Sequence, residues 1–413
     1  MPPPETTAER EFDVIVWGAT GFTGQLVVEY LAANYPPAQP LRWAVGARNR
    51  EKLARVLDAI SFPAEKPEII IADGLDSTSM EEMAARTKVV LTTVGPYAKY
   101  GSPLVAACAR LGTDYCDLTG ETQWIRRMID EHEQTARDSG ARILMSCAFD
   151  SVPSDIGVHV LNRDASRIHG QPCRSVTMLV RAMKGGASGG TIASILNVID
   201  EARSDRSVAR LMNDPYALNP SGEREGPDGR DQAGAVYNDH AGVWTAPFIM
   251  AAINTRNVRR TNALLGYPYG RDFRYSEATI TGSGLAGRVK AALMSAGLRL
   301  FVVVAAITPL RRLLVQPFLP EPGEGPTREE RESGYFNLLM IGELDDGTVM
   351  RLRIKGDRDP GYGSTSRMLA ETAVCLAQDG PEVGGGIWTP AAALGDKLLT
   401  RLVRNAGLSF ELE

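Results

Sequence analysis

The sequence predicts an α/β protein: a doubly wound parallel sheet in the N-terminal part, followed by a second, α+β domain. Three observations predict it. Short apolar runs alternate with segments of helical spacing through about residue 150, an order that builds a parallel sheet covered by helices on both faces. A glycine-rich stretch joins the first apolar run to the first helical segment. Beyond residue 155 the chain turns to longer strands and polar loops. Its 413 residues suffice for two domains.

Five apolar runs in the N-terminal part are typical of buried strands. They lie at 12–18, 41–47, 68–73, 89–95 and 141–148. Between them, residues 24–35 and 102–112 carry apolar side chains at helical spacing. We therefore assign residues 1–155 to a first domain with βαβ alternation.

The second domain is expected over residues 156–356. Its predicted elements are a strand at 173–185, a helix at 188–203, a polar Gly/Pro-rich loop at 213–242, a strand at 273–281 and a hairpin within 334–356. The hairpin is indicated by an Asp-Asp-Gly turn between two runs of alternating apolar residues. The last segment, 357–413, predicts two helices around a Gly-Gly-Gly turn.

One segment, residues 291–310, is long and apolar enough to cross a bilayer, with Arg299 as its single charge. An arginine in mid-membrane is costly, so a span is disfavoured. Two interpretations stay open: a buried or tunnel-lining helix, or a helix that contacts a membrane surface through residues 288–312.

Charge and cysteine content exclude several classes of protein. The net charge is −5 with a pI near 5.6, which argues against a general nucleic-acid surface. Five scattered cysteines, none in a Cys-x-x-Cys pair, argue against a disulfide framework or a structural zinc site. The N-terminus lacks an apolar run after a basic start, so no secretory signal is expected. We expect a cytoplasmic protein, with peripheral contact at the inner face of the plasma membrane as an option.

The glycine-rich stretch, VIVWGATGFTG (14–24), ends a predicted strand and opens a predicted helix, which is the context of a dinucleotide-binding Rossmann turn. Gly18 would form the turn, Gly21 would admit the pyrophosphate, and Gly24 would let helix and strand pack closely. The spacing is Gly-x-x-Gly-x-x-Gly rather than Gly-x-Gly-x-x-Gly. The residues expected to contact the cofactor here are Gly18, Ala19, Thr20, Gly21, Phe22, Thr23 and Gly24.

The end of the second strand indicates which cofactor is bound. NAD-binding domains usually carry an acidic residue there, whereas this chain has Arg48. A guanidinium binds the 2′-phosphate that a carboxylate would repel, so we predict NADP(H), bound as NADPH, with Arg48 as the main contact. Asp73, after the third strand, is expected near the adenine. The turn after the fourth strand, with Val94, Gly95 and Pro96, is expected near the nicotinamide.

Candidate catalytic residues follow the fourth and fifth predicted strands, where ligands of such sheets bind. No Tyr-x-x-x-Lys and no His-Glu-x-x-His occurs, which disfavours short-chain dehydrogenase and zinc chemistry. Tyr97 or Tyr100 could donate a proton, with Lys99 lowering the pKa of the tyrosine. No metal is expected. The other polar residues in these segments are Asp117, Thr119, Glu121, Cys147, Asp150, Ser151 and Asp155.

Taken in order, GATGFTG, VGPYAKYG, YCDLTGE, AFDSVPSD, KGGASGGTIAS, GDRDPGYGSTSRML and GGGIWTPAAALG resemble the saccharopine dehydrogenase-like oxidoreductases over nearly the full chain. The chain looks closest to their trans-acting enoyl reductase branch. That resemblance implies reduction of an enoyl intermediate on a polyketide synthase, in the synthesis of phthiocerol dimycocerosates and phenolic glycolipids. It also implies that the C-terminal helices pack back on the first domain.

Three functions remain in competition. The first is an NADPH-dependent enoyl reductase acting on a polyketide or fatty acyl substrate, carried on a synthase acyl carrier; the apolar segment 291–310 favours it. The second is a saccharopine-type amino acid dehydrogenase, for which Lys184 beside a glycine-rich helix start could hold a carboxylate. The same stretch could instead hold a thioester or a phosphate, or simply let the helix pack closely on the sheet. The third is a non-catalytic NADP-binding protein on lipid surfaces. We expect a homodimer in each case.

Overall fold

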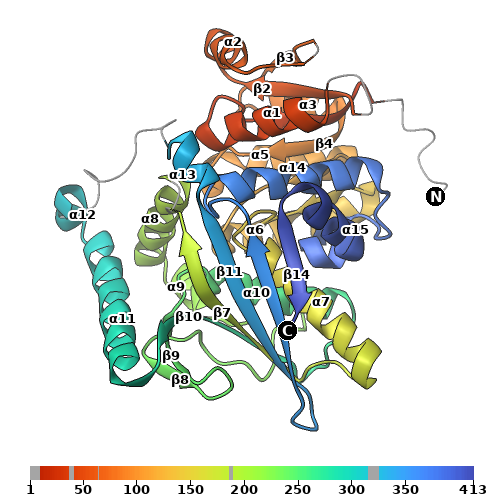
Figure 1. Cartoon of the computed structure of the whole chain (residues 1–413). Coiled ribbons are helices and arrows are strands. Elements are labelled where there is room, and N and C mark those ends of the chain that lie inside the picture. The colour runs from red at the N-terminus through yellow and green to blue at the C-terminus, as the bar shows by residue number, and fades with distance from the viewer. Residues whose placement is uncertain (1–9, 37–40, 64, 186–188, 315–324) are drawn as a thin grey trace.

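The computed structural model describes residues 10–36, 41–63, 65–185, 189–314 and 325–413. Two seven-stranded sheets organise it, one near each end of the molecule in Figure 1, with the C-terminal helices between them. This confirms the predicted fold class of a doubly wound parallel sheet followed by a second domain with mixed strands.

The first sheet is parallel throughout and has the order β13-β6-β5-β4-β1-β2-β3. Its strands are β1 (Phe12–Trp17), β2 (Trp43–Ala47), β3 (Glu68–Ile71), β4 (Thr87–Thr92), β5 (Asp114–Cys116), β6 (Arg142–Leu144) and β13 (Gly386–Trp388). All six residues of β1 are buried, because helices cover both faces of the sheet. The chain order reverses between β1 and β4, which makes their carboxyl ends the place where a ligand binds.

In the described residues up to 169, seven helices accompany this sheet. They are α1 (Phe22–Asn34), α2 (Arg50–Ala59), α3 (Ser77–Ala85), α4 (Tyr97–Tyr100), α5 (Ser102–Leu111), α6 (Thr122–Ser139) and α7 (Val152–His169). The five predicted strands correspond to β1, β2, β3, β4 and β6. Strand β5 was not predicted, because it does not lie within a longer apolar run, as the equally short β6 does.

The second sheet has the order β14-β12-β11-β7-β10-β9-β8 and is mixed, since β10 and β7 are parallel. Its strands are β7 (Ser175–Lys184), β8 (Val236–Asn238), β9 (Val243–Pro247), β10 (Arg274–Gly282), β11 (Tyr335–Glu343), β12 (Val349–Gly356) and β14 (Leu408–Leu412). Strands β11 and β12 form the predicted hairpin, with Gly347 at φ +83° in its turn. The predicted polar loop is irregular except for β8.

The helices after α7 are α8 (Gly189–Ser204), α9 (Arg206–Met212), α10 (Ala251–Leu264), α11 (Gly284–Ala306), α12 (Thr308–Leu314), α13 (Arg328–Glu332), α14 (Gly363–Gln378) and α15 (Pro390–Asn405). Helices α14 and α15 pack against each other, and α14 also packs against α1 and β4. The predicted return of the C-terminal helices to the first domain is therefore confirmed. The domain limits at residues 155 and 356 stay a prediction.

A buried carboxylate joins α1 to α14 and α15. Glu371 is fully buried, and its Oε1 accepts hydrogen bonds from the hydroxyls of Tyr30 and Tyr35, both at 2.7 Å. Its Oε2 accepts from Asn405 Nδ2 at 3.1 Å and lies 3.3 Å from Arg401 Nη1. A buried carboxylate needs such partners, because moving an unpaired charge from water into the protein interior costs too much free energy.

We expect Glu371→Ala to lower the free energy of unfolding by about 3 kcal/mol, since it leaves the Arg401 guanidinium and two tyrosine hydroxyls without their common acceptor. Chemical unfolding followed by tryptophan fluorescence measures this change. The matched control is Glu382→Ala, because the Glu382 side chain is 88% exposed and surface pairs contribute little. Equal stability of both variants would contradict the role given to Glu371.

Helix α11 is the one helix in the described ranges that is long and apolar enough to cross a membrane, with 17% of its most apolar window buried. It stands at one side of the molecule in Figure 1. It is therefore not a buried core helix. Leu298, Phe301 and Val302 on one of its sides line a cavity, as the tunnel-lining interpretation expects.

Candidate functional site

The turn between β1 and α1 has the shape that a dinucleotide needs. Gly18 has φ +94°, and a Cβ on it would lie 2.6 Å from Val94 Cγ2. A Cβ on Gly24 would lie 2.2 Å from the carbonyl oxygen of Gly18, so only glycine lets α1 approach the turn. Helix α1 begins after Gly21 with no side-chain cap, which leaves its first N–H groups available to a pyrophosphate. These residues fit NADP(H).

The other predicted cofactor contacts surround this turn. Arg48 follows β2, is exposed and forms no ion pair or hydrogen bond with a described residue. The side chain of the next residue, Asn49, caps the N-terminus of α2 by accepting a hydrogen bond from Lys52 N. Asp73 is exposed after β3, and its carboxylate accepts a hydrogen bond from Leu75 N at 3.1 Å. Val94, Gly95 and Pro96 follow β4 after Thr93, and Val94 lies beside Gly18.

The predicted proton donors lie in the short helix α4. The Tyr97 side chain is buried, and its hydroxyl donates to Thr92 O at 3.1 Å and accepts from Leu118 N at 3.4 Å. Burial raises the pKa of Tyr97 well above its ordinary value. Lys99 is exposed and Tyr100 half-buried, and neither lines the neighbouring cavity. Tyr97 itself is among the residues that line that cavity. The donor role of these three residues stays a prediction.

A cavity of about 440 Å³ opens at the carboxyl edge of the first sheet. Thr23, Thr93 and Gly95 form its wall on the cofactor side. The opposite walls come from α8, from residues 247–253 and from α11, and their side chains include Ile195, Val198, Phe248, Met250, Leu298 and Phe301. This volume suits a small-molecule substrate, and the lining is mainly apolar. A second cavity of about 110 Å³, lined partly by residues 360–361, shares Thr23 and Asp150 with it.

Among the described residues that line the cavity, two are carboxylates, Asp150 and Asp231, and they have different partners. Asp231 forms an ion pair with Arg256 and accepts a hydrogen bond from Thr255 Oγ1 at 3.0 Å. Asp150 follows β6 and forms no hydrogen bond or ion pair with a described residue. Burial raises the pKa of Asp150 to about 7. Asp150 can therefore hold a proton near neutral pH, as a general acid must.

The remaining predicted polar residues hold the loops of this edge. Glu121 accepts hydrogen bonds from the N–H groups of Tyr97 and Ala98 at 2.8 and 3.0 Å, and from Ser194 Oγ of α8 at 2.8 Å. It thereby ties the turn after β4 to the cavity wall.

The neighbouring carboxylates and hydroxyls face the protein interior. Asp117 accepts from Thr119 N and from Ser146 N, both at 3.0 Å, and Asp155 accepts from Ala391 N at 2.8 Å. The Asn257 side chain donates to Ser151 Oγ at 2.7 Å, and the Cys147 thiol is buried with its pKa raised. These groups position the backbone rather than a substrate.

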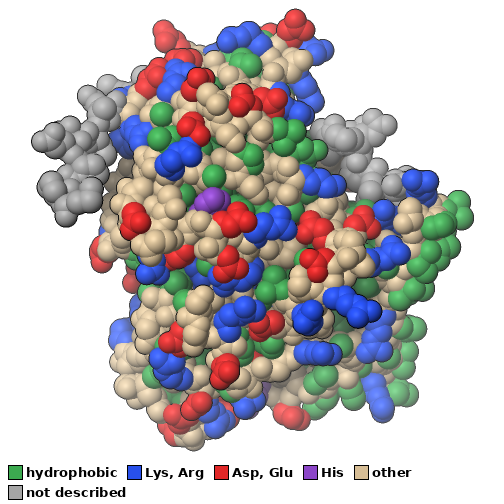
Figure 2. Space-filling model, turned by 180° about the vertical axis from the view of Figure 1, so that it is seen from behind, with side chains coloured by type: hydrophobic (Ala, Val, Ile, Leu, Met, Phe, Trp, Pro, Cys, Tyr) green, Lys and Arg blue, Asp and Glu red, His purple; other side chains and the backbone are tan. Residues whose placement is uncertain are grey.

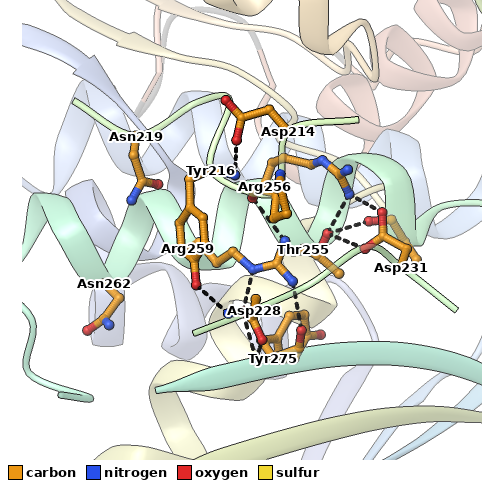
Figure 3. Close-up of polar contacts among 12 residues, drawn as sticks. Asp214, Tyr216, Asn219, Asp228, Asp231, Thr255, Arg256, Arg259, Asn262 and Tyr275 are labelled. Atoms are coloured by element: carbon orange, nitrogen blue, oxygen red, sulfur yellow. Dashed lines mark hydrogen bonds and ion pairs between the residues drawn. The ribbon is translucent and has the colours of Figure 1, made fainter. Parts of the chain in front are cut away.

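The arginines of α10 are not among the described residues that line the cavity. Helix α10 carries three, Arg256, Arg259 and Arg260, and all are buried. Figure 3 shows Arg256 directed at Asp231, and Arg259 between Asp228 and Tyr275. Arg259 also donates to Pro215 O at 2.9 Å, and Arg260 donates to Leu218 O. Their role is to fasten residues 212–231 to α10.

Lys184, predicted as a carboxylate-binding residue, is exposed at the end of β7 and donates to Ser333 Oγ at 3.0 Å. It does not line the cavity. Part of the glycine-rich stretch after it, residues 186–188, lies outside the described residues. None of the described residues that line the cavity is Lys or Arg.

Residues 247–253 were not predicted to belong to the site. They carry no motif, because apolar lining residues have the same composition as ordinary core. Two sequence signals did point to the other walls: the glycine-rich start of α8, of which Gly190, Thr191 and Ser194 line the cavity, and the apolar character of 291–310.

Comparisons with known proteins identify the same family, and the similar proteins align with nearly the whole chain. Residues 14–144 match the saccharopine dehydrogenase NADP-binding domain. A trans-acting enoyl reductase of Mycobacterium bovis is 40% identical over 96% of both chains, and one of Mycobacterium ulcerans is 38% identical over 96% of this chain and 97% of its own. A Mycobacterium tuberculosis protein that provisionally carries the same name is 43% identical over 98% of both chains.

One solved structure has the same fold over its full length. The apo saccharopine dehydrogenase (L-Glu forming) of Saccharomyces cerevisiae aligns with a TM-score of 0.54 and 12% identity, covering 97% of this chain and 99% of its own. At this identity the likeness concerns the fold.

Proposed function

The chain belongs to the trans-acting enoyl reductases, a branch of the saccharopine dehydrogenase-like oxidoreductases, and we propose that it reduces the double bond of a long acyl or polyketide thioester in the cavity described above. It is an NADP(H)-dependent oxidoreductase. The proposal concerns the substrate, the place of the reaction and the residues that serve it.

The observation that carries the proposal is the apolar cavity beside the predicted nicotinamide position, without Lys or Arg among its described lining residues. A dicarboxylated amino acid such as saccharopine needs several converging cations to offset its desolvation. The arginines of α10 are engaged with Asp228, Asp231 and backbone carbonyls instead. An acyl chain needs only apolar contact, which α8 and α11 offer.

Each residue of the site then has one task. The free N–H groups at the start of α1 hold the pyrophosphate, and Arg48 binds the 2′-phosphate. When bound, NADPH supplies a hydride for the β-carbon of the enoyl group. Asp150 holds a proton on its carboxyl oxygen and gives it to the α-carbon, so that the carbon–carbon π bond is replaced by two C–H bonds. The carboxylate left on Asp150 regains a proton from water.

The experiment is a substrate series with the purified full chain, followed by the loss of NADPH absorbance. We expect oxidation of NADPH with 2-enoyl thioesters and a lower KM for dodecenoyl than for crotonyl thioester, because more apolar surface is buried. NADP+ with saccharopine should give no reduction. Tight NADPH binding without turnover of any enoyl thioester, free or carried on an acyl carrier protein, would contradict the proposal.

The setting of the reaction is proposed as well. We propose that the substrate arrives on the acyl carrier of a polyketide synthase that lacks its own reductase, as the word trans-acting in the names of the relatives suggests. The lipid made would be of the phthiocerol dimycocerosate or phenolic glycolipid type. We further propose a homodimer that works in the cytoplasm.

A further inference from the structure

The structure assigns an anionic membrane surface as the partner of one side of the molecule, formed by α11 and α12. We call this surface the α11–α12 ridge and define it by its six most exposed large apolar side chains. They are Leu285, Leu293, Leu300, Val303, Leu313 and Leu314, exposed by 74, 68, 63, 54, 69 and 52%. Figure 2 shows apolar and basic side chains together along this edge of the molecule. A contiguous exposed apolar surface marks an interaction site.

The helix is oriented with its large side chains outward. At 3.6 residues per turn, the four ridge residues of α11 fall within an arc of about 80° on one face. The buried positions of α11 are small residues, among them Ala291, Ser295 and Ala305. They let the helix lie close to β9 and β10, against which it packs. In a helix that packs on a soluble core, the large apolar side chains would be buried and the small residues would be exposed.

The charges on this segment are all of one sign. Residues 284–314 contain Arg288, Lys290, Arg299, Arg311 and Arg312 and no acidic residue, in a chain whose net charge is −5. Arg311 is paired with Asp200, and Arg299 donates to Ala233 O at 2.8 Å. Lys290 and Arg312 are exposed and form no ion pair with a described residue. Basic residues beside an apolar helix face are what an anionic lipid surface attracts.

These observations favour a lipid surface over a protein partner. The ridge is aliphatic, whereas protein interfaces are usually centred on aromatic side chains. A second copy docked about a two-fold axis would bring cations against cations. A span of the bilayer is disfavoured, because the other side of α11 packs on β9, β10 and α8. The helix would therefore lie in the plane of the membrane surface, with its apolar face among the acyl chains.

This placement has a consequence for the cavity. Leu298 and Phe301 of α11 line the cavity, while Leu300 and Val303 belong to the ridge. One helix thus separates the proposed acyl site from the membrane. Membrane attachment itself does not depend on which substrate is reduced.

Flotation of the full chain with liposomes tests the inference. We expect the wild type to float with phosphatidylcholine–phosphatidylglycerol vesicles and to bind pure phosphatidylcholine vesicles about tenfold more weakly. The variant Leu300→Glu, Val303→Glu should lose flotation. Its turnover of a soluble enoyl thioester should be unchanged, because these two side chains do not line the cavity.

The matched control is Ile168→Glu, Val403→Glu, which makes the same chemical change at exposed apolar positions on α7 and α15. It should float like the wild type. No flotation of the wild type, or undiminished flotation of the ridge variant, would overturn the inference. So would a ridge variant that turns a wild-type dimer into a monomer, since a second copy would then be the occupant. A failed enoyl assay with normal flotation would contradict only the proposed function.

Discussion

Replacing Asp150 by Asn is expected to lower kcat for enoyl thioester reduction by about 10²- to 10⁴-fold, the usual contribution of a general acid. The amide keeps the size of the side chain but has no proton to give to the α-carbon. Binding of NADPH should be unchanged, because Asp150 follows β6 and is not part of the glycine turn between β1 and α1. Stopped-flow oxidation of NADPH and a separate NADPH titration measure the two quantities.

The pH profile gives the same prediction a second readout. A general acid works in its protonated form, so kcat/KM of the wild type should fall as pH rises through about 7, the pKa of Asp150. The fall should be missing in Asp150→Asn, and Asp150→Glu should restore part of the rate. Tyr97→Phe is the contrast, because the Tyr97 hydroxyl is bonded to Thr92 O and Leu118 N. A large loss in Tyr97→Phe with a small loss in Asp150→Asn would return the donor role to Tyr97.

Changing Arg48 to Asp is expected to weaken NADPH binding by about 10²-fold or more. The guanidinium loses its charge-assisted bonds to the 2′-phosphate, and a carboxylate repels that group. Binding of NADH should hold or improve, since an acidic residue at this position can bond the ribose hydroxyls. Calorimetric titration with both coenzymes measures the change of preference.

The control for that experiment is Arg50→Asp. Arg50 is also exposed and begins α2, two residues beyond Arg48, so the variant makes the same change of charge near the same strand end. We expect a shift of less than about fivefold, because exposed charges at a distance are screened by solvent and salt. Equal shifts for both variants would show that net charge, rather than a direct contact of Arg48, decides the coenzyme.

Much of the cofactor domain could be predicted, because its signals are local. Strands β1, β2, β3, β4 and β6 coincide with apolar runs, and the glycine spacing marked the turn that follows β1. Strands β5, β6 and β13 are three residues each, but only β6 lies within a longer apolar run that marks it as a strand. The other two are strands because the neighbours on the sheet accept their hydrogen bonds, and for β13 the neighbour is more than 200 residues earlier in the sequence.

The sequence alone did not show which polar residue donates the proton. Tyr97 and Asp150 were both visible as polar residues after strands, but their exposure and bonding are tertiary properties. The fold gives the Tyr97 hydroxyl two backbone partners and leaves Asp150 with none among the described residues. The cavity wall from 247–253 comes from a segment whose sequence looks like core, and only its arrangement in space distinguishes it. The start of α8 was marked by its glycines, but the sequence did not show that its apolar side chains face the cavity.

The C-terminal segment contributes a strand to each sheet, β13 to the first and β14 to the second, and its helix α14 covers β4. When the ribosome has synthesised the chain up to α7, strand β13 and helix α14, which complete the first sheet and cover it, are therefore still to be translated. During that interval the nascent chain exposes apolar sheet surface, which is the situation that recruits chaperones. A fragment that ends after α7 would therefore lack part of the dinucleotide-binding sheet. A chimera that uses this region must also include the C-terminal segment with β13 and α14.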